Sequence, residues 1–196
     1  MEVKREYSYL QVASGQGTYA WIDYNSDGVQ QLNEFEQTNI NEALQWLNSK
    51  RKIKAVLSEE FMIQLHKRML GMVWKWAGQF RRTETNIGID WTRISMELRL
   101  LVDDANFWVE HQTYLPEEIA IRFKHRLVSI HCFPNGNGRH SRIMADLIYQ
   151  HVFDLKKFGW GQSSLVEPSA QRTEYLKALK LADKGDYSEL MRFARS

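Results

Sequence analysis

One stretch of the chain, residues 131–142, concentrates the residue types that phosphate chemistry needs. It reads His-Cys-Phe-Pro-Asn-Gly-Asn-Gly-Arg-His-Ser-Arg. Gly136 and Gly138 carry no Cβ, so the backbone between them can turn sharply and direct consecutive N–H groups at one oxyanion. Asn137 can add a side-chain amide donor. The pattern therefore predicts a seat for a polyphosphate, with His131 at its rim.

Two arginines follow the glycines and can complete this seat. Arg139 is expected to open a helix, where unsatisfied backbone donors and the helix dipole already favour an anion. Its guanidinium can bind phosphate oxygens through two parallel hydrogen bonds. Arg142 lies three residues further on, one helical turn away and on the same face. Outside such a context, either arginine would be interpreted as half of a surface ion pair.

The same stretch resembles the motif of the Fic family, His-Pro-Phe-x-(Asp/Glu)-Gly-Asn-Gly-Arg-x-x-Arg. Two positions depart from it: Cys132 stands where proline is usual, and Asn135 where an acidic residue is usual. The chain is most similar to the branch of small bacterial Fic proteins called mobile mystery protein B. The matching positions are His131, Phe133, Gly136, Asn137, Gly138, Arg139 and Arg142.

The resemblance extends to both sides of the motif. Upstream, residues 73–81 are similar to the family's Trp-Ala-Gly-x-(Tyr/Phe)-Arg segment, and residues 83–94 to the β-hairpin flap that follows it. Downstream, residues 172–187 resemble the closing helices. We therefore expect an N-terminal extension at 1–31 and a Fic domain at 32–196, with the flap at about 83–94 and the active-site loop at 131–139.

Composition is that of an ordinary globular protein. The 196 residues have a net charge of +2, so no global field argues for nucleic acid as a partner. The 43% hydrophobic content is typical, and no apolar run approaches the length of a membrane span. Residues 1–6 lack the apolar centre of a signal peptide, so a cytoplasmic location is expected. Cys132 is the single cysteine, and we interpret it as a small buried hydrophobe rather than a nucleophile.

The elements that must position the motif are predicted to be helices, because apolar residues recur at intervals of three and four and prolines are rare. We predict helices at 33–49, from Ser58 onward, and at 96–110, 116–130, 139–153, 167–181 and 187–193. Residues 82–94 instead alternate Thr, Ile and Trp with polar residues around Gly88 and Asp90, which predicts a hairpin. The expected fold class is all-α, a Fic-fold helical bundle with a small β-hairpin flap.

The resemblance implies an enzyme that transfers AMP from ATP to a Ser, Thr or Tyr hydroxyl of a target protein. His131, whose unperturbed pKa lies near neutrality, would take the hydroxyl proton. Residues 136–138 would hold the α- and β-phosphates, while Arg139 and Arg142 would grip the β- and γ-phosphates. The Doc-type kinase branch carries lysine in place of Gly138, so the glycine favours AMP transfer over phosphoryl transfer.

Asn135 bears on the metal. In most of the family, a carboxylate at this position holds Mg²⁺, and an amide oxygen is a weaker ligand for a hard divalent ion. Phosphate oxygens and water can supply most of the octahedron, so we still expect Mg²⁺ as the cofactor that accompanies ATP.

The flap residues would receive a segment of the target protein as an added strand, which fixes register but selects little sequence. The expected partners are therefore ATP and a hydroxyl-bearing protein, which can be the chain itself. Neither a membrane nor a nucleic acid is expected, and the oligomeric state, a homodimer included, stays open. The docking residues are Thr85, Asn86, Ile87 and Gly88.

An autoinhibitory segment is predicted upstream of the motif. Residues 38–43, Thr-Asn-Ile-Asn-Glu-Ala, resemble the family's inhibitory helix, (Ser/Thr)-x-x-x-Glu-(Gly/Asn), with Ala43 departing at the last position. A glutamate from this helix would pair with Arg142 and so deny the γ-phosphate its guanidinium. Glu42 is the predicted inhibitory residue, and the alternative is a solvated helix glutamate.

A second pattern matches the EF-hand calcium loop, with Gly28 at the turn. Gln30 replaces the usual aliphatic residue, and residues 8–22 contain no convincing entering helix. We therefore favour a polar loop that leads into the next helix, and do not expect calcium. The residues at the ligand positions are Asp23, Asn25, Asp27 and Glu34.

Three rival functions stay open at this point. The same loop could transfer UMP or phosphocholine instead of AMP. Asn135 could have cost the domain its metal, which would leave a module that binds nucleotide without consuming it. The chain could also be a toxin-like scaffold, or the partner of an antitoxin, whose main role is protein association.

Overall fold

The computed structural model describes residues 12–13, 19–20, 26–50, 52–53, 55–161 and 168–196. Two short strands, β1 (Val12–Ala13) and β2 (Tyr19–Ala20), pair antiparallel. A 3₁₀ turn, η2 (Trp91–Arg93), and a π-helical turn, η3 (Ile148–Val152), lie among the helices. The helices are α2 (Ser26–Asn48), α3 (Glu59–Leu70), α4 (Ile94–Glu110), α5 (Pro116–Ile130), α6 (Asn137–Leu147), α7 (Pro168–Ala182) and α8 (Ser188–Arg195). The expected helical fold is confirmed.

Helices begin where the local sequence favours a helix start. The Ser58 side chain accepts a hydrogen bond from the Phe61 N–H at 3.2 Å and so caps α3. Glu59 and Glu60 follow in the first turn, where negative charge complements the positive end of the helix dipole. Pro116 occupies the first turn of α5, where no intrahelical N–H is needed.

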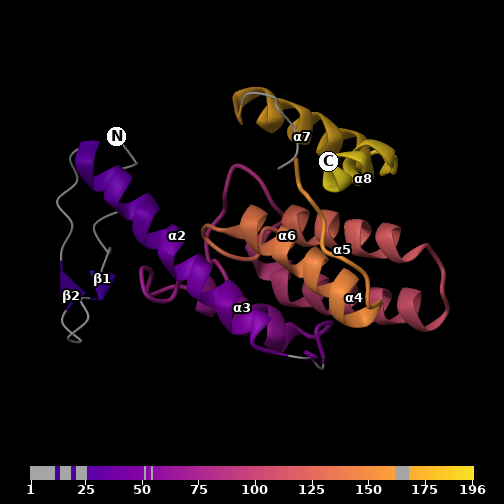
Figure 1. Ribbon diagram of the computed structural model, residues 1–196, viewed down its shortest axis with the longest axis horizontal. Coiled ribbons are helices and arrows are strands. Elements are labelled where there is room, and N and C mark those ends of the chain that lie inside the picture. The colour runs from indigo at the N-terminus through magenta and orange to yellow at the C-terminus, as the bar shows by residue number, and fades with distance from the viewer. Residues whose placement is uncertain (1–11, 14–18, 21–25, 51, 54, 162–167) are drawn as a thin grey trace.

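The bundle places the motif helix α6 at its centre. α2 lies along α3, while α5 packs against both α4 and α6, as Figure 1 shows. α7 and α8 pair with each other, and α8 reaches α5. No helix in the described ranges is both long and apolar enough to cross a bilayer. Fully buried side chains from three of these helices, Met62, Leu65, Phe123 and Met144, join in one hydrophobic core.

The helix α2 begins earlier than expected. It runs without interruption from Ser26, across the predicted boundary between residues 31 and 32, and that boundary remains a prediction. It also begins inside the EF-hand pattern, whose first ligand positions, Asp23 and Asn25, lie outside the described residues. Asp27 and Glu34 lie within α2, whereas a calcium loop holds its ligands on a non-helical turn. The backbone at Asp27 and Glu34 is therefore helical and does not have the form of an EF-hand loop.

The flap is not a hairpin. All residues from 81 to 94 are described, and they form bends and the turn η2 but no strand. The backbone N–H of Ile89 donates to Ile130 O at the end of α5, at 3.5 Å, instead of bonding across the flap. The side chain of Thr85 bonds locally to Ile87 O at 2.5 Å. The alternating pattern failed here because the flap's backbone finds its partners outside the flap.

Candidate active site

His131 ends helix α5 in a left-handed conformation, with φ 55° and ψ 59°. This conformation is uncommon for a residue with a side chain, and it turns the chain from α5 into the motif loop. The imidazole is half-buried, and its Nδ1 has no hydrogen-bond partner among the described residues. Burial, and then the charge of Arg81, lower the pKa of His131. The ring is therefore in its neutral form at pH 7 and can accept a proton.

The motif loop is closed by the side chain of Asn137. Its Oδ1 accepts a hydrogen bond from the Phe133 N–H at 3.0 Å, and its Nδ2 donates to Phe133 O at 2.7 Å. The Asn137 side chain is buried, so both bonds are protected from water. The amide therefore closes the loop in this structure, and its expected role as a phosphate donor stays a prediction.

Gly136 and Gly138 have different structural roles. Gly136 is the N-cap of α6 with φ 79°, and a Cβ there would lie 2.6 Å from Leu70 Cδ1. A Cβ at Gly138 would meet no heavy atom within 4 Å, so the space beside it is open. Intrahelical bonding begins with the His140 N–H, which donates to Gly136 O at 2.9 Å. The N–H groups of residues 137–139 precede that bond and form the anion-favouring end of the helix.

His66 of α3 lies beneath this loop, although no sequence pattern pointed to it. Its buried ring stacks on Phe133, with centroids 3.7 Å apart. The Gly78 N–H donates to Nδ1 at 3.0 Å, which leaves Nε2 to donate to Asn135 O, also at 3.0 Å. Burial lowers the pKa of His66 to about 4, so the ring stays neutral. Because a trans peptide is planar, the inward Asn135 carbonyl directs the Gly136 N–H away from His66.

Asn135 is exposed at the tip of the loop, and its Oδ1 accepts that Gly136 N–H at 2.7 Å. An amide oxygen has two lone pairs, so one is left for a metal ion. The described residues include no group of three or more His, Cys, Asp or Glu side chains that could hold a metal. The single oxygen of Asn135 fits a Mg²⁺ ion whose other ligands are nucleotide phosphates and water. It does not suffice to bind a free ion.

The first arginine of the motif is engaged by helix α2. Arg139 Nη2 lies 2.7 Å from Glu36 Oε2, and the Glu36 side chain is only 6% exposed. The other carboxylate oxygen of Glu36 accepts a hydrogen bond from Trp74 Nε1 at 2.6 Å. Glu36 is thus held from two sides in a buried position next to the start of α6.

The second arginine turns towards helix α7. The Arg142 guanidinium lies 4.4 Å from the ring centroid of Tyr175, and its buried Nε has no partner among the described residues. Lys124 of α5, which is fully buried, donates to Tyr175 Oη. Burial, followed by the charge of Arg142, lowers the pKa of Lys124 well below its ordinary value. The two arginines therefore lie one helical turn apart but have different neighbours.

Glu42 does not take the place expected of it. Its side chain is exposed on α2, beside Lys67 and Arg68 of α3. The structure forms no ion pair between Glu42 and Arg142, both of which it describes. The prediction that Glu42 contacts the motif is corrected to Glu36, six residues earlier on the same helix.

A signal in the sequence could have identified Glu36. The buried side chains of α2 recur at intervals of three and four, and Glu36 falls on this stripe; its apolar members are Leu32, Ile40, Ala43 and Leu47. A charged residue on a buried stripe must be paired, since an unpaired buried charge is costly. His66 gives a similar signal on the buried face of α3.

Cys132, next to His131, is buried, and burial raises the pKa of its thiol to about 12. The thiol is therefore protonated at neutral pH, which is consistent with the interpretation of Cys132 as a small buried hydrophobe.

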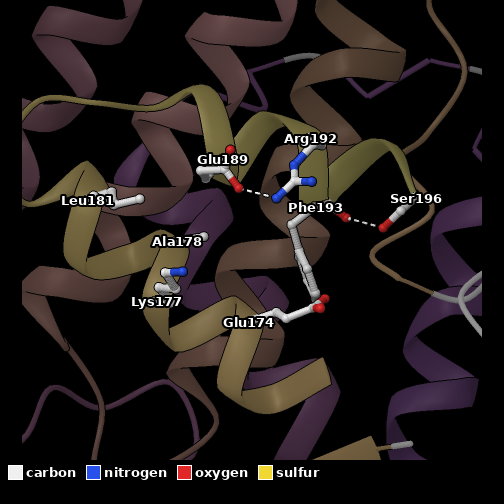
Figure 2. A pocket seen from close by; sticks show the side chains of 8 residues that line it. All are labelled: Glu174, Lys177, Ala178, Leu181, Glu189, Arg192, Phe193 and Ser196. Carbon is white, nitrogen blue, oxygen red and sulfur yellow. Dashed lines mark hydrogen bonds and ion pairs between the residues drawn. The ribbon is translucent and has the colours of Figure 1, made fainter. Parts of the chain in front are cut away.

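A separate hollow lies between α7 and α8, as Figure 2 shows. Its walls carry both signs of charge, with Glu174 and Lys177 on α7 and the ion pair of Glu189 with Arg192 on α8. No residue of the motif lines it. The residues selected by the sequence motif therefore lie at the junction of α5 and α6 and not around this hollow.

Comparison with known proteins identifies the family. The model of the Fic/DOC family matches residues 56–149. The chain is 30% identical over 155 residues to the protein adenylyltransferase Fic of Drosophila melanogaster, an alignment that covers 77% of this chain and 30% of that protein. The chain thus spans about 30% of the length of the curated relatives it matches.

Solved structures share the fold. The N-terminal FIC domain of the Bep8 protein from Bartonella sp. 1-1C is similar with a TM-score of 0.70 and 14% identity, over 98% of this chain and 95% of that one. The BepC protein of Bartonella tribocorum, solved with bound AMPPNP, is similar with a TM-score of 0.60 and 16% identity, over 88% and 90%. The bundle, with its glycine-rich loop at the start of α6, is a Fic fold. The chain belongs to the Fic/DOC family, while its predicted branch within the family stays a prediction.

Proposed function

We propose that this domain is a protein adenylyltransferase, which transfers AMP from ATP to a Ser, Thr or Tyr hydroxyl of a target protein. The observation that carries the proposal is the junction between α5 and α6. There a neutral, half-buried imidazole, His131, precedes a helix start whose first N–H groups can bind phosphate. The name of the Drosophila relative and the AMPPNP bound to BepC support the same chemistry.

In the proposed reaction, the target's hydroxyl oxygen attacks the α-phosphorus of ATP while His131 accepts the hydroxyl proton. The bond from the α-phosphorus to the oxygen shared with the β-phosphate breaks, and pyrophosphate leaves with that oxygen. Residues 136–138 would stabilise the charge on the transferred phosphorus from the end of α6. Arg139 and Arg142 would hold the β- and γ-phosphates of the leaving group.

Magnesium is proposed to enter with ATP, where it would neutralise phosphate charge. Asn135 would supply one neutral oxygen through the lone pair that its bond to the Gly136 N–H leaves over. We expect weaker metal affinity than a carboxylate would give at this position.

We also propose that the enzyme restrains itself through α2. Glu36 neutralises Arg139 and removes its guanidinium from the phosphates, so ATP binding in the productive pose must compete with the ion pair. Glu36 is nearly buried and is held by Trp74 as well, which makes release costly. Movement of α2 away from α6 would therefore activate the domain.

The target is proposed to dock along the flap. Ile87 is 63% exposed and can pack against an incoming segment, and the backbone N–H groups of residues 85–88, which have no backbone partner among the described residues, would bond to an added strand. This form of docking sets the register of the target but selects little sequence. The docking residues remain those expected, Thr85, Asn86, Ile87 and Gly88.

Incubation with ATP labelled on the α-phosphate, or separately on the γ-phosphate, tests the activity. We expect α-label alone to become attached to protein, and expect His131→Ala to abolish the attachment. Transfer of γ-label would indicate phosphoryl transfer, and a different adduct in mass spectrometry would indicate another donor. Calorimetric binding of ATP without any turnover, in wild type and Glu36→Gln alike, would instead favour a nucleotide-binding module.

A further inference from the structure

Arg81, which ends the Trp-Ala-Gly segment, is buried to 3% exposure. Its guanidinium donates to backbone carbonyl oxygens on both sides of the active site: Nε to His131 O at 2.7 Å, and Nη1 to Thr83 O at 3.0 Å. Nη2 donates to Ile89 O and, at 3.4 Å, to Ile130 O. In the part of the chain that is described, no carboxylate forms an ion pair with this guanidinium.

These contacts join the two ends of the flap to the end of α5, which lies 50 residues further along the chain at His131. Thr83 and Ile89 flank the tip of the flap, and residues 130–132 are the end of α5 with the catalytic histidine. The backbone of Arg81 adds a further bond, from its N–H to Cys132 O at 2.9 Å. One side chain therefore holds the two ends of the flap and the catalytic position at fixed separations.

The flap crosses close above the catalytic histidine. Gly88 has φ 105°, and a Cβ built there would lie 2.7 Å from His131 Cβ and 2.9 Å from Arg81 Nη2. The flap can approach this closely only because residue 88 is glycine. Its position is thus set against both His131 and Arg81.

We propose that Arg81 is a positioning residue of the active site, which fixes the docking flap to the backbone of the catalytic histidine. The proposal rests on the proposed function, in which His131 is the base and the flap receives the target. The last carbonyl groups of α5 lack intrahelical partners and attract a cation. A planar guanidinium can serve several of them at once, whereas a lysine ammonium acts as one compact charge.

The charge of Arg81 has a second effect. A cation next to an imidazole disfavours its protonated form, and Arg81 contributes, after burial, to the lowered pKa of His131. The other titratable groups at this corner are the neutral thiol of Cys132 and the flap carboxylate Asp90, which is exposed and bonded to Thr92. The hydrogen bonds of the Arg81 guanidinium therefore fix the position of the flap, and its positive charge lowers the pKa of His131.

Three variants separate these effects from each other and from general damage. Arg81→Lys keeps the positive charge but loses the several hydrogen bonds of the guanidinium, and Arg81→Gln loses both. Arg82→Gln, which changes the exposed neighbouring residue, is the matched control. NMR titration of the His131 imidazole and amide exchange at Ile89, both on the protein without nucleotide, need no activity. A wild type without AMP transfer would therefore refute the proposed function while leaving the role of Arg81 measurable.

We expect the pKa of His131 to rise towards its ordinary value in Arg81→Gln and to stay near the wild-type value in Arg81→Lys. Amide exchange at Ile89 should accelerate about tenfold or more in both, because the flap loses its anchor. If AMP transfer occurs, kcat should fall about tenfold or more in both, with the acid limb of the pH profile moved upward only in Arg81→Gln. Wild-type exchange at Ile89 in a folded Arg81→Lys protein would overturn the proposal.

Discussion

Glu36 and Arg139 form an ion pair across the contact between α2 and the start of α6, with 2.7 Å between Oε2 and Nη2. The pair places a carboxylate where the proposed reaction needs a guanidinium free for phosphate. The same carboxylate also accepts the Trp74 indole N–H, so α2, the Trp-Ala-Gly segment and the motif are joined at one point. A change in the position of α2 would therefore alter the position of the Arg139 guanidinium in the proposed phosphate-binding site through this contact.

Replacement of Glu36 by glutamine should raise self-modification. The amide keeps the volume and can still accept from Trp74, but it no longer neutralises Arg139. Loss of a charge-assisted hydrogen bond at this site is worth about 1.5–3 kcal/mol, so we expect an increase of roughly tenfold or more in label transferred from ATP.

Glu42→Gln is the matched control, since Glu42 lies on the same helix but is exposed and away from the motif. Its rate of self-modification should equal that of wild type. Activation by Glu42→Gln without activation by Glu36→Gln would show that Glu42 is the inhibitory residue, as the sequence pattern predicts. It would refute the proposal that Glu36 has this role.

Replacement of Asn135 by aspartate should strengthen the response to magnesium. The carboxylate keeps the acceptor that bonds to the Gly136 N–H, so the loop shape is retained, and it adds the negative charge that a hard cation prefers. The Mg²⁺ concentration for half-maximal AMP transfer should fall, on the order of tenfold. Asn135→Ala should raise it, and identical magnesium curves for all three proteins would exclude residue 135 from the metal site.

Replacement of Asn137 by alanine should destabilise the loop. The variant leaves the buried N–H and C=O of Phe133 without their side-chain partners. An unsatisfied buried group costs about 1–3 kcal/mol, so the midpoint of chemical denaturation should fall and AMP transfer should be lost. Asn86→Ala on the exposed flap is the control for stability. A fully stable Asn137→Ala protein would show that the loop does not depend on this amide.

The helices could be predicted because their causes are local. Ser58 and Pro116 lie at the helix starts that their chemistry favours, and apolar spacing identified the buried faces. The motif loop could be recognised for the same reason, since the backbone turns sharply at Gly136, as expected of a glycine there, with φ 79°. Local sequence patterns were sufficient to predict those elements whose conformation depends on residues adjacent in the sequence.

The parts that could not be predicted depend on contacts between distant segments. The flap alternates like a strand, but Arg81 and the end of α5 take its backbone hydrogen bonds. The inhibitory pattern selected Glu42, whereas α2, packed on α3, brings Glu36 to Arg139 at the start of α6. Asn137 has the type of a phosphate donor, yet its burial turns both of its polar atoms to the loop. A residue type shows what chemistry is available, and only the packing decides which partner receives it.

Acid should weaken the fold through two buried histidines below the motif loop. Burial lowers the pKa of His66 to about 4 and that of His140 to about 3. In the unfolded chain both titrate near 6.5, so between these values the unfolded state binds more protons than the native state. Their contribution to stability is therefore complete above about pH 6.5 and is lost as the pH falls. For His66 alone the loss reaches about 3 kcal/mol near pH 4.

Asp146 acts in the opposite direction, because burial raises the pKa of its carboxyl to about 6 and the native state then holds a proton that the unfolded state releases. Its shift is smaller than those of the two histidines together, so the free energy of unfolding should still decline from pH 7 to pH 4.5. Urea denaturation at several pH values measures this. His66→Gln should flatten the decline and Asp146→Asn should steepen it, whereas a wild-type stability that rises towards pH 4.5 would contradict the assignment of His66 and His140 as neutral, buried groups.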